Sequence, residues 1–153
     1  NANLTLSQNK VIGFTEYVDD WTNGGQVSRD LGTTDLAFSP SVIFGSEISY
    51  LPLESLSLAL FSKYVGEQYI DNSSNDDIKL DAYFVNDLLV SYKWETSFIP
   101  KIGLSLRVNN LLNEKYETYA WVYRYFLDGE YYTMDGYFPQ AGTNFLFALN
   151  LKF

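Results

Sequence analysis

The chain has 153 residues, a net charge of −9, no His, no Cys and an aromatic content of 18%. The length suits one domain, and so acidic a chain is a poor partner for nucleic acid, which requires clustered Lys and Arg. Without Cys or His the chain lacks disulfides, thiol catalysis, Cys-based zinc sites and the commonest general base. We therefore expect a protein that is not an enzyme and that holds no cofactor and no metal.

Alternation of apolar and polar residues is the main pattern, and it predicts six strands. The first spans 2–18, although its phase slips in the middle. The polar segment 19–35 follows it and carries the turn signal Gly24-Gly25. The second strand spans 34–51 and ends in a short turn at 51–55. The third spans 56–70 and leads into a polar loop at 71–79.

The second half of the chain continues the same alternation. A fourth strand spans 80–94 and a turn follows at 95–101. The fifth strand begins at 102 and continues as far as 126, before a Tyr-rich loop at 127–142. The sixth is "TNFLFALNLKF" (143–153), in which every second residue is apolar: Phe145, Phe147, Leu149, Leu151 and Phe153.

The lengths of these elements indicate a membrane barrel. The predicted strands are far longer than the usual 5–6 residues, and short connections alternate with long ones. Long, tilted antiparallel strands with short turns at one end and long loops at the other are typical of outer-membrane barrels. We therefore expect an all-β, antiparallel transmembrane β-barrel architecture in which the six strands lie side by side in sequence order.

The two faces of the strands support the barrel over a β-sandwich. One face is apolar, whereas the other carries small residues and isolated charges, which suits a wet or plugged lumen: Glu47, Lys63, Glu67, Asp87 and Arg107. Aromatic residues near strand ends suit interfacial girdles: Tyr50, Tyr64, Tyr92, Trp94 and Phe153. A soluble β-sheet module that binds carbohydrate and a passive porin remain as alternatives.

Over essentially its whole length, the chain resembles the last six strands of a TonB-dependent outer-membrane receptor. The segments "LRVNNLLNEKYETYAWVYRYF" (106–126) and "GYFPQAGTNFLFALNLKF" (136–153) carry the resemblance, and "KYVGEQYIDN" (63–72) adds to it. The matching positions of the family's pattern are Asn110, Leu111, Asn113, Lys115, Tyr116, Pro139, Gly142 and Phe153.

This resemblance implies a fold, a function and a set of partners. Residues 1–153 would be the six C-terminal strands of a barrel of about 22 strands with a plugged lumen, without the plug domain and the preceding strands. The function would be energy-coupled uptake of an extracellular ligand, most often a ferric siderophore or other iron complex. The location would be the outer membrane of a Gram-negative bacterium. Partners would be outer-membrane lipid and lipopolysaccharide, a TonB-type energy-coupling protein acting through parts not present, and the barrel-assembly machinery.

Two groups of residues are candidates for specific roles. The terminal Phe153, with Leu151, Leu149, Phe147 and Phe145, resembles the signal that the assembly machinery reads. The predicted ligand-binding residues suit a flat, anionic or sugar-like ligand through stacking and a charge-assisted hydrogen bond: Tyr119, Trp121, Tyr123, Arg124 and Tyr125. Their alternative role is an aromatic girdle with loop packing, and we expect Tyr131, Tyr132, Tyr137 and Phe138 to pack across a hairpin against the segment 116–126 that carries them.

The acidic loop "DNSSNDD" (71–77) invites a calcium site but fails the helix-loop-helix template. Asp76 stands where Gly is needed and Ala82 where a bidentate Glu belongs. We predict a solvated loop instead. The predicted topology places 19–33, 71–79 and 127–142 on one, extracellular rim, with 51–55, 95–101, Asn1 and Phe153 near the periplasmic end.

Overall fold

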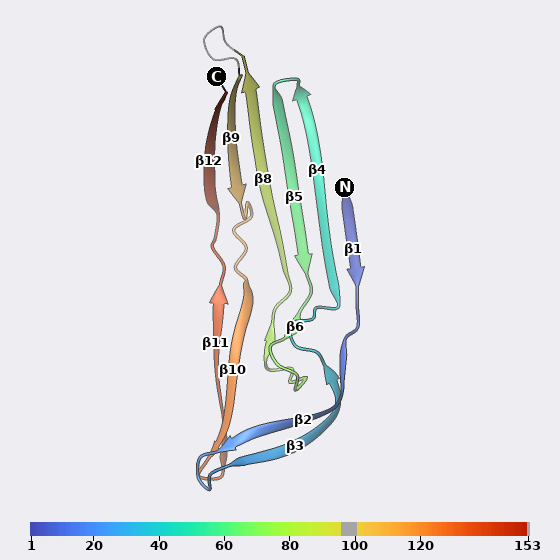
Figure 1. Ribbon diagram of the computed structural model, residues 1–153, viewed down its shortest axis with the longest axis vertical. Helices are drawn as coiled ribbons and strands as arrows, with labels where there is room; N and C mark the ends of the chain where they lie inside the picture. Colours follow the sequence, from blue (N-terminus) through green and yellow to red (C-terminus); the bar gives the residue numbers. More distant parts are fainter. Residues whose placement is uncertain (96–100, 153) are drawn as a thin grey trace.

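The protein folds into two tiers of β-sheet (Figure 1). The computed structural model describes residues 1–95 and 101–152, and it is all-β and mainly antiparallel over these residues. No helix in that part of the chain is long and apolar enough to cross a membrane. The all-β, antiparallel prediction is therefore confirmed.

A six-stranded sheet, here called the main sheet, contains parts of all six predicted strands in sequence order. Each neighbouring pair is antiparallel, which confirms the predicted sheet. No second sheet covers it (Figure 1), and Leu149 remains 54% exposed, so it is not half of a sandwich. The strands, in spatial order, are β1 (Ala2–Leu6), β4 (Val42–Leu53), β5 (Leu56–Val65), β8 (Tyr83–Trp94), β9 (Lys101–Asn109) and β12 (Asn144–Lys152).

A second sheet, here called the hairpin sheet, corrects the predicted loops. Segments 19–35 and 127–142 were expected to be loops, but most of their residues extend two β-hairpins. The strands, in spatial order, are β11 (Glu130–Pro139), β10 (Glu117–Leu127), β2 (Lys10–Asp20) and β3 (Gln26–Asp35). The predicted first, second and fifth strands are each interrupted, because the chain leaves the main sheet to build this tier.

Turn chemistry explains these hairpins. Gly24 and Gly25 have φ of 77° and 79°, a region that glycine enters without steric cost. The Asp20 carboxylate accepts hydrogen bonds from the backbone of Thr22 and Asn23, which fixes this turn. In the other hairpin Asp128 and Gly129 both have positive φ, as the tightest hairpin turns require. The prediction was therefore wrong at both places, because a polar segment at 19–35 and a Tyr-rich segment at 127–142 were both assigned to loops.

The predicted polar loop at 71–79 has an apolar anchor. It connects two short strands, β6 (Gln68–Tyr69) and β7 (Lys79–Leu80). Side chains from its base pack against β10 in a small core that consists of Ile70, Ile78, Leu80 and Ala120, with Val122 beside it. This core fixes the connection between β5 and β8 to the hairpin sheet.

The main sheet has one apolar face, and its aromatic residues mark two levels. Phe44, Tyr64 and Phe84 form a cross-strand row near one end, and the rings of Tyr92 and Trp94 lie 5.7 Å apart near the other. The rows between are mainly aliphatic, with Leu58, Val90 and Leu106 in register with Phe147. Many of these side chains are exposed, including Ile48, Phe145, Phe147 and Leu149.

The spacing of the two aromatic levels matches a bilayer. Phe84 and Trp94 are about 33 Å apart along β8 at about 3.3 Å per residue. A strand tilted by about 40° spans about 25 Å of depth over that length, which is the height of the apolar band of outer-membrane barrels.

The opposite face of the main sheet is polar. Arg107 forms an ion pair of 2.7 Å with Asp87, and its guanidinium lies over the ring of Phe61 at 5.6 Å. Glu47 and Lys63 lie on the same face, whereas Glu67 lies beyond β5 and contacts Lys79. The sequence therefore placed four of the five isolated charges on this face correctly.

The ends of the main sheet follow most of the predicted topology. The turn between β4 and β5 lies at one end, and the β2–β3 hairpin, the 71–79 connection and the β10–β11 hairpin lie towards the other (Figure 1). Asn1 corrects the prediction, because its backbone hydrogen-bonds that of Glu47 in the middle of β4, away from the rim. Phe153 and most of the turn at 95–101 lie outside the described residues.

Asn110 joins the two tiers. It adopts φ of 50°, which Asn tolerates better than most residues. Its buried side chain donates to the carbonyls of Glu114 and Ala141 and accepts from the Glu114 amide. Thr143 donates its hydroxyl to the Asn110 carbonyl. These hydrogen bonds fasten the "NNLLNEKY" connection from β9 to β10 against the connection from β11 to β12.

Candidate functional site

The predicted ligand-binding residues all lie on β10, but they occupy two faces. Successive side chains of a strand point to opposite sides, so Arg124 faces away from the four aromatic residues. Tyr119, Trp121, Tyr123 and Tyr125 share one face, here called the aromatic face. The structure therefore places the four rings on one face of β10 and separates the cation from them.

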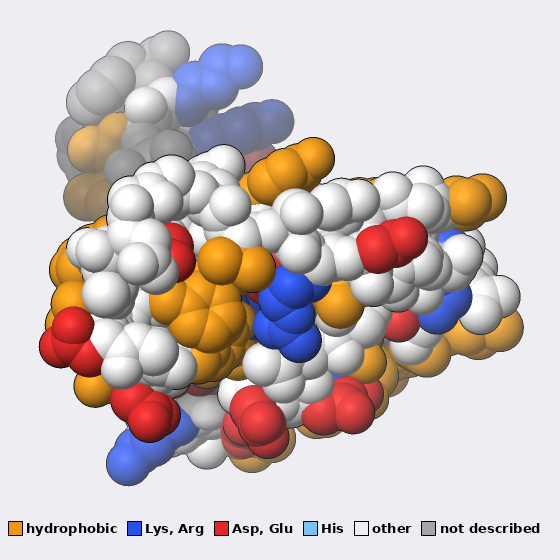
Figure 2. Space-filling model, turned by 90° about the horizontal axis from the view of Figure 1, so that it is seen from below, with side chains coloured by type: hydrophobic (Ala, Val, Ile, Leu, Met, Phe, Trp, Pro, Cys, Tyr) orange, Lys and Arg blue, Asp and Glu red, His pale blue; other side chains and the backbone are white. Residues whose placement is uncertain are grey.

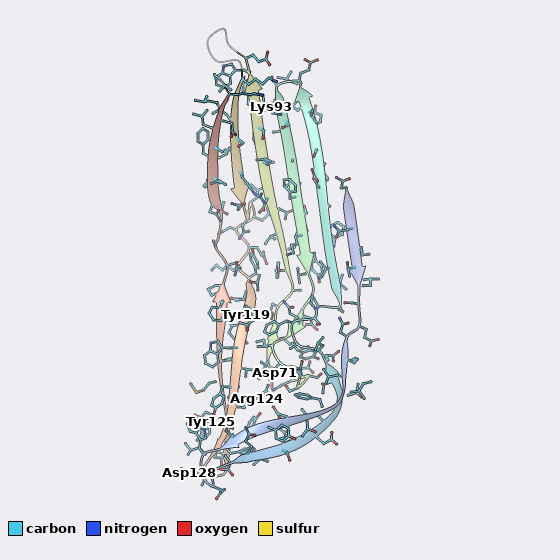
Figure 3. All side chains as sticks on the ribbon, viewed as in Figure 1. Asp71, Lys93, Tyr119, Arg124, Tyr125 and Asp128 are labelled. Carbon is cyan, nitrogen blue, oxygen red and sulfur yellow. The ribbon has the colours of Figure 1, made fainter. Side chains whose placement is uncertain are left out.

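Arg124 is the centre of a buried ion cluster, here called the clamp. Its side chain is 7% exposed, and one terminal nitrogen lies 2.6 Å from both Glu16 of β2 and Asp71 of the β6–β7 connection. The other terminal nitrogen donates to Ser73 at 3.2 Å. Figure 3 shows Arg124 pointing towards Asp71. The clamp thus joins three segments that are far apart in the sequence.

The positive charge of Arg124 is already balanced by the carboxylates of the clamp. Burial alone would lower the pKa of Arg124, but attraction to Asp71 and the hydrogen bond with Glu16 outweigh it and raise the pKa. Arg29 approaches Glu16 at 3.4 Å from the solvent side, with its own side chain 49% exposed. The Nε of Arg124 makes no hydrogen bond among the described residues, but it is buried, and the two carboxylates beside the guanidinium would repel an anionic ligand, so the predicted charge-assisted contact does not match the geometry.

A stack of three rings, here called the ring stack, covers part of the aromatic face. Trp21, which sequence reasoning missed, stacks on Tyr125 with ring centroids 4.1 Å apart. Tyr125 in turn stacks on Tyr132 at 5.4 Å. The two outer members, Trp21 and Tyr132, are 55% and 44% exposed. The only sequence signal for Trp21 was its place beside the Gly24-Gly25 turn.

A hydrogen-bond chain leads from the ring stack to a carboxylate. The indole nitrogen of Trp21 donates to the Tyr123 hydroxyl at 3.1 Å, and that hydroxyl donates to Asp19 at 2.6 Å. Gln26 donates to the other oxygen of Asp19. The Tyr123 hydrogen bond, followed by that from Gln26, lowers the pKa of Asp19, so this carboxylate is ionised at neutral pH.

A second aromatic group lies nearer the main sheet. Tyr119 stacks on Phe38 at 4.8 Å and contacts Phe138 at 5.8 Å. Trp121 lies opposite Gly136, where an added Cβ would collide with the indole. Across the hairpin, Tyr131 packs on Phe126 and Tyr132 on Tyr125. The expected packing across the hairpin is therefore confirmed for Tyr131, Tyr132 and Phe138, while Tyr137 lies in register with Ala120.

An open cavity, here called the edge cavity, lies between β2 and β10. Its volume is about 350 Å³, within the usual range of small-molecule sites. Its charged lining residues are Glu16, Asp19, Asp71 and Arg124, and Tyr123 and Gln26 belong to the same wall. Seen from the hairpin end, exposed apolar side chains lie among both acidic and basic ones (Figure 2).

The acidic loop is occupied by internal contacts. Asp71 binds Arg124 and accepts from Ser73, and Asp76 binds Lys79 at 2.7 Å and Tyr69 at 3.2 Å. In the part of the chain that the structure describes, no group of three or more acidic side chains is arranged to hold a metal ion. Through Asp71 and Ser73, this connection supplies two of the side chains that hold Arg124 in the clamp.

Comparisons with known proteins support the fold. No family model matches the sequence, and no curated protein matches it. The structure is similar to the crystal structure of the ferric citrate transporter FecA in its unliganded form, with a TM-score of 0.55 and 16% sequence identity. The similarity covers 81% of this chain and 18% of that chain. At this identity the likeness concerns the fold, and the chain spans less than a fifth of the transporter.

Proposed function

We propose that this chain is the C-terminal part of a TonB-dependent receptor, which takes up an extracellular iron complex across the outer membrane of a Gram-negative bacterium. The main sheet would be a section of the barrel wall, with its apolar face towards lipid and its polar face towards a plugged lumen. The hairpin sheet would stand outside the membrane. An inner-membrane complex, acting through parts of the protein not present here, would supply the energy.

The single observation that carries this proposal is the main sheet itself. It is an uncovered layer with one apolar face and one polar face, and two aromatic levels bound the apolar face; at the tilt typical of outer-membrane barrels their separation along β8 corresponds to about 25 Å of depth. Soluble domains rarely expose so large a contiguous apolar surface to water. The similarity to the ferric citrate transporter adds support for the transport role.

The edge of the main sheet also favours a larger barrel. Within a bilayer every backbone polar group needs a partner, so sheets that span it are closed. β1 and β12 are the edges of this six-stranded sheet, and both would pair with strands of the complete receptor. Of the proposed assembly signal, Phe145, Phe147, Leu149 and Leu151 lie on the apolar face, and Phe153 lies outside the described residues.

Iron uptake tests the function directly. Cells with and without the full-length protein would be grown under iron limitation and given radioactive iron bound to a citrate, a hydroxamate or a catecholate chelator. We expect the protein to raise uptake of at least one complex severalfold, and a protonophore to abolish that increase. Equal uptake in both strains for all three chelators would contradict the iron assignment, and uptake that persists with the protonophore would indicate a porin.

A further inference from the structure

Carboxylates outnumber basic groups both on the aromatic face and in the edge cavity. Asp19, Glu117 and Glu130 lie on or beside this face, and Asp128 lies in its turn. The sequence of β10 and β11 contains one basic residue, Arg124, which points to the other face. A ligand that approaches these rings therefore meets carboxylates and no competing cation from the hairpin.

The edge cavity continues the same pattern. Three carboxylates, from Glu16, Asp19 and Asp71, face one guanidinium, that of Arg124, which leaves a formal charge of −2. Counting Arg29, which contacts Glu16 from the solvent side, leaves −1. Asp19 makes no ion pair among the described residues; its partners are the neutral donors Tyr123 and Gln26, so its charge remains available to a ligand.

From this geometry we propose that the edge cavity and the ring stack bind an organic cation, such as a quaternary or protonated amine on an apolar body. The electron-rich faces of Trp and Tyr attract such cations, and the ionised Asp19 supplies the counter-charge. Asp19 and Tyr123 line the edge cavity, and the indole of Trp21 hydrogen-bonds the Tyr123 hydroxyl, so the ring stack lies beside the cavity and not in its wall. The overall charge of −9 would raise the local concentration of a cation further.

This inference rests on the proposed function, because it describes the ligand that the receptor's external tier would meet. It also separates this chain from a receptor for an anionic chelate, since the neutralised Arg124 offers little to a carboxylate-rich ligand. A cationic or amine-bearing iron complex would satisfy both proposals.

Three probes that share a phenyl ring test the charge preference on the purified full-length protein in detergent. The probes are benzyltrimethylammonium, neutral benzyl alcohol and anionic phenylmethanesulfonate, with binding followed by quenching of Trp fluorescence. We expect saturable binding of the ammonium, about three- to thirtyfold tighter than that of the alcohol, and no measurable binding of the sulfonate. Binding of the ammonium should weaken as salt is raised.

Two variants and one control locate the site. Asp19→Asn removes the charge but keeps an acceptor for Tyr123, so it should weaken the ammonium severalfold and leave the alcohol unchanged. Tyr125→Leu removes the central ring and should abolish binding. Glu54→Gln, at the β4–β5 turn, makes the same change of charge at the opposite end of the molecule and should have no effect.

The results separate the two proposals. Absence of saturable ammonium binding, equal binding of the sulfonate, or an effect of Glu54→Gln as large as that of Asp19→Asn would overturn the cation site whatever the iron-uptake result. Normal ammonium binding in a protein that takes up no iron would keep the cation site and refute the iron assignment alone.

Discussion

Replacing Arg124 by Met is expected to loosen the hairpin sheet while the main sheet stays folded. The substitution leaves Glu16 and Asp71 facing each other without their shared cation, and the Glu16 side chain is only 10% exposed. Removing one partner of a buried ion cluster typically costs about 3–5 kcal/mol. The substitution should lower the free energy of local opening of the segments around 10–35 and 66–82, because these are the segments that the clamp joins to β10.

Hydrogen exchange on the full-length protein measures this opening segment by segment. We expect amide protection in β2 and β3 to fall by two orders of magnitude or more, while protection in β5 and β8 stays unchanged. Arg29→Met is the matched control: Arg29 is half exposed and lies 3.4 Å from Glu16, so its loss should cost less than about 1 kcal/mol. Equal effects of the two variants would show that Arg124 does not hold the tier together.

Replacing Leu106 by Arg is expected to block insertion of the main sheet into the membrane. Leu106 lies in the middle row of the apolar face, between Val90 and Phe147, and it is 38% exposed. An Arg at the bilayer midplane on the lipid face of a barrel costs about 2–4 kcal/mol. The amount of full-length receptor that reaches the outer membrane should fall several-fold.

The neighbouring residue provides the control for this variant. Ser105 precedes Leu106 on the same strand and points to the opposite, polar face, where it lies in register with Ser91 and Ala148. Ser105→Arg therefore introduces the same charge at the same depth on the lumen side, and we expect nearly normal membrane levels. If Ser105→Arg were the more harmful of the two, the two faces would be assigned the wrong way round.

The alternation of residues was enough to predict the main sheet but not the hairpin sheet. Strands of period two with one apolar face specify their register strongly, and this placed all six strands in order. The β2–β3 hairpin was missed because most residues of β3 are polar, and the β10–β11 hairpin because the Asp128-Gly129 turn, a strong hairpin signal, was included in a loop. Gly13, with φ of 68°, accounts for the phase slip that blurred β2.

The contacts of the candidate site could be predicted only in part from the sequence, for a different reason. The parity of β10 alone would have separated Arg124 from the four rings, since 124 is even and the aromatic positions are odd. Its partners could not be found this way, because Glu16 and Asp71 come from other segments distant in the sequence. Trp21 likewise joins the ring stack only through the parallel contact of β2 with β10.

The most direct test of the proposed membrane topology is to determine which end of the main sheet faces the outside of the cell. This chain contains no Cys, and single Cys residues can be introduced into the full-length receptor at Asp128, in the β10–β11 turn, and at Glu54, in the β4–β5 turn, with labelling of the unchanged receptor as the background. We expect a membrane-impermeant maleimide to label Asp128→Cys on intact cells and to label Glu54→Cys only after the outer membrane is opened. Labelling of Glu54→Cys on intact cells, with Asp128→Cys protected, would contradict the proposed topology.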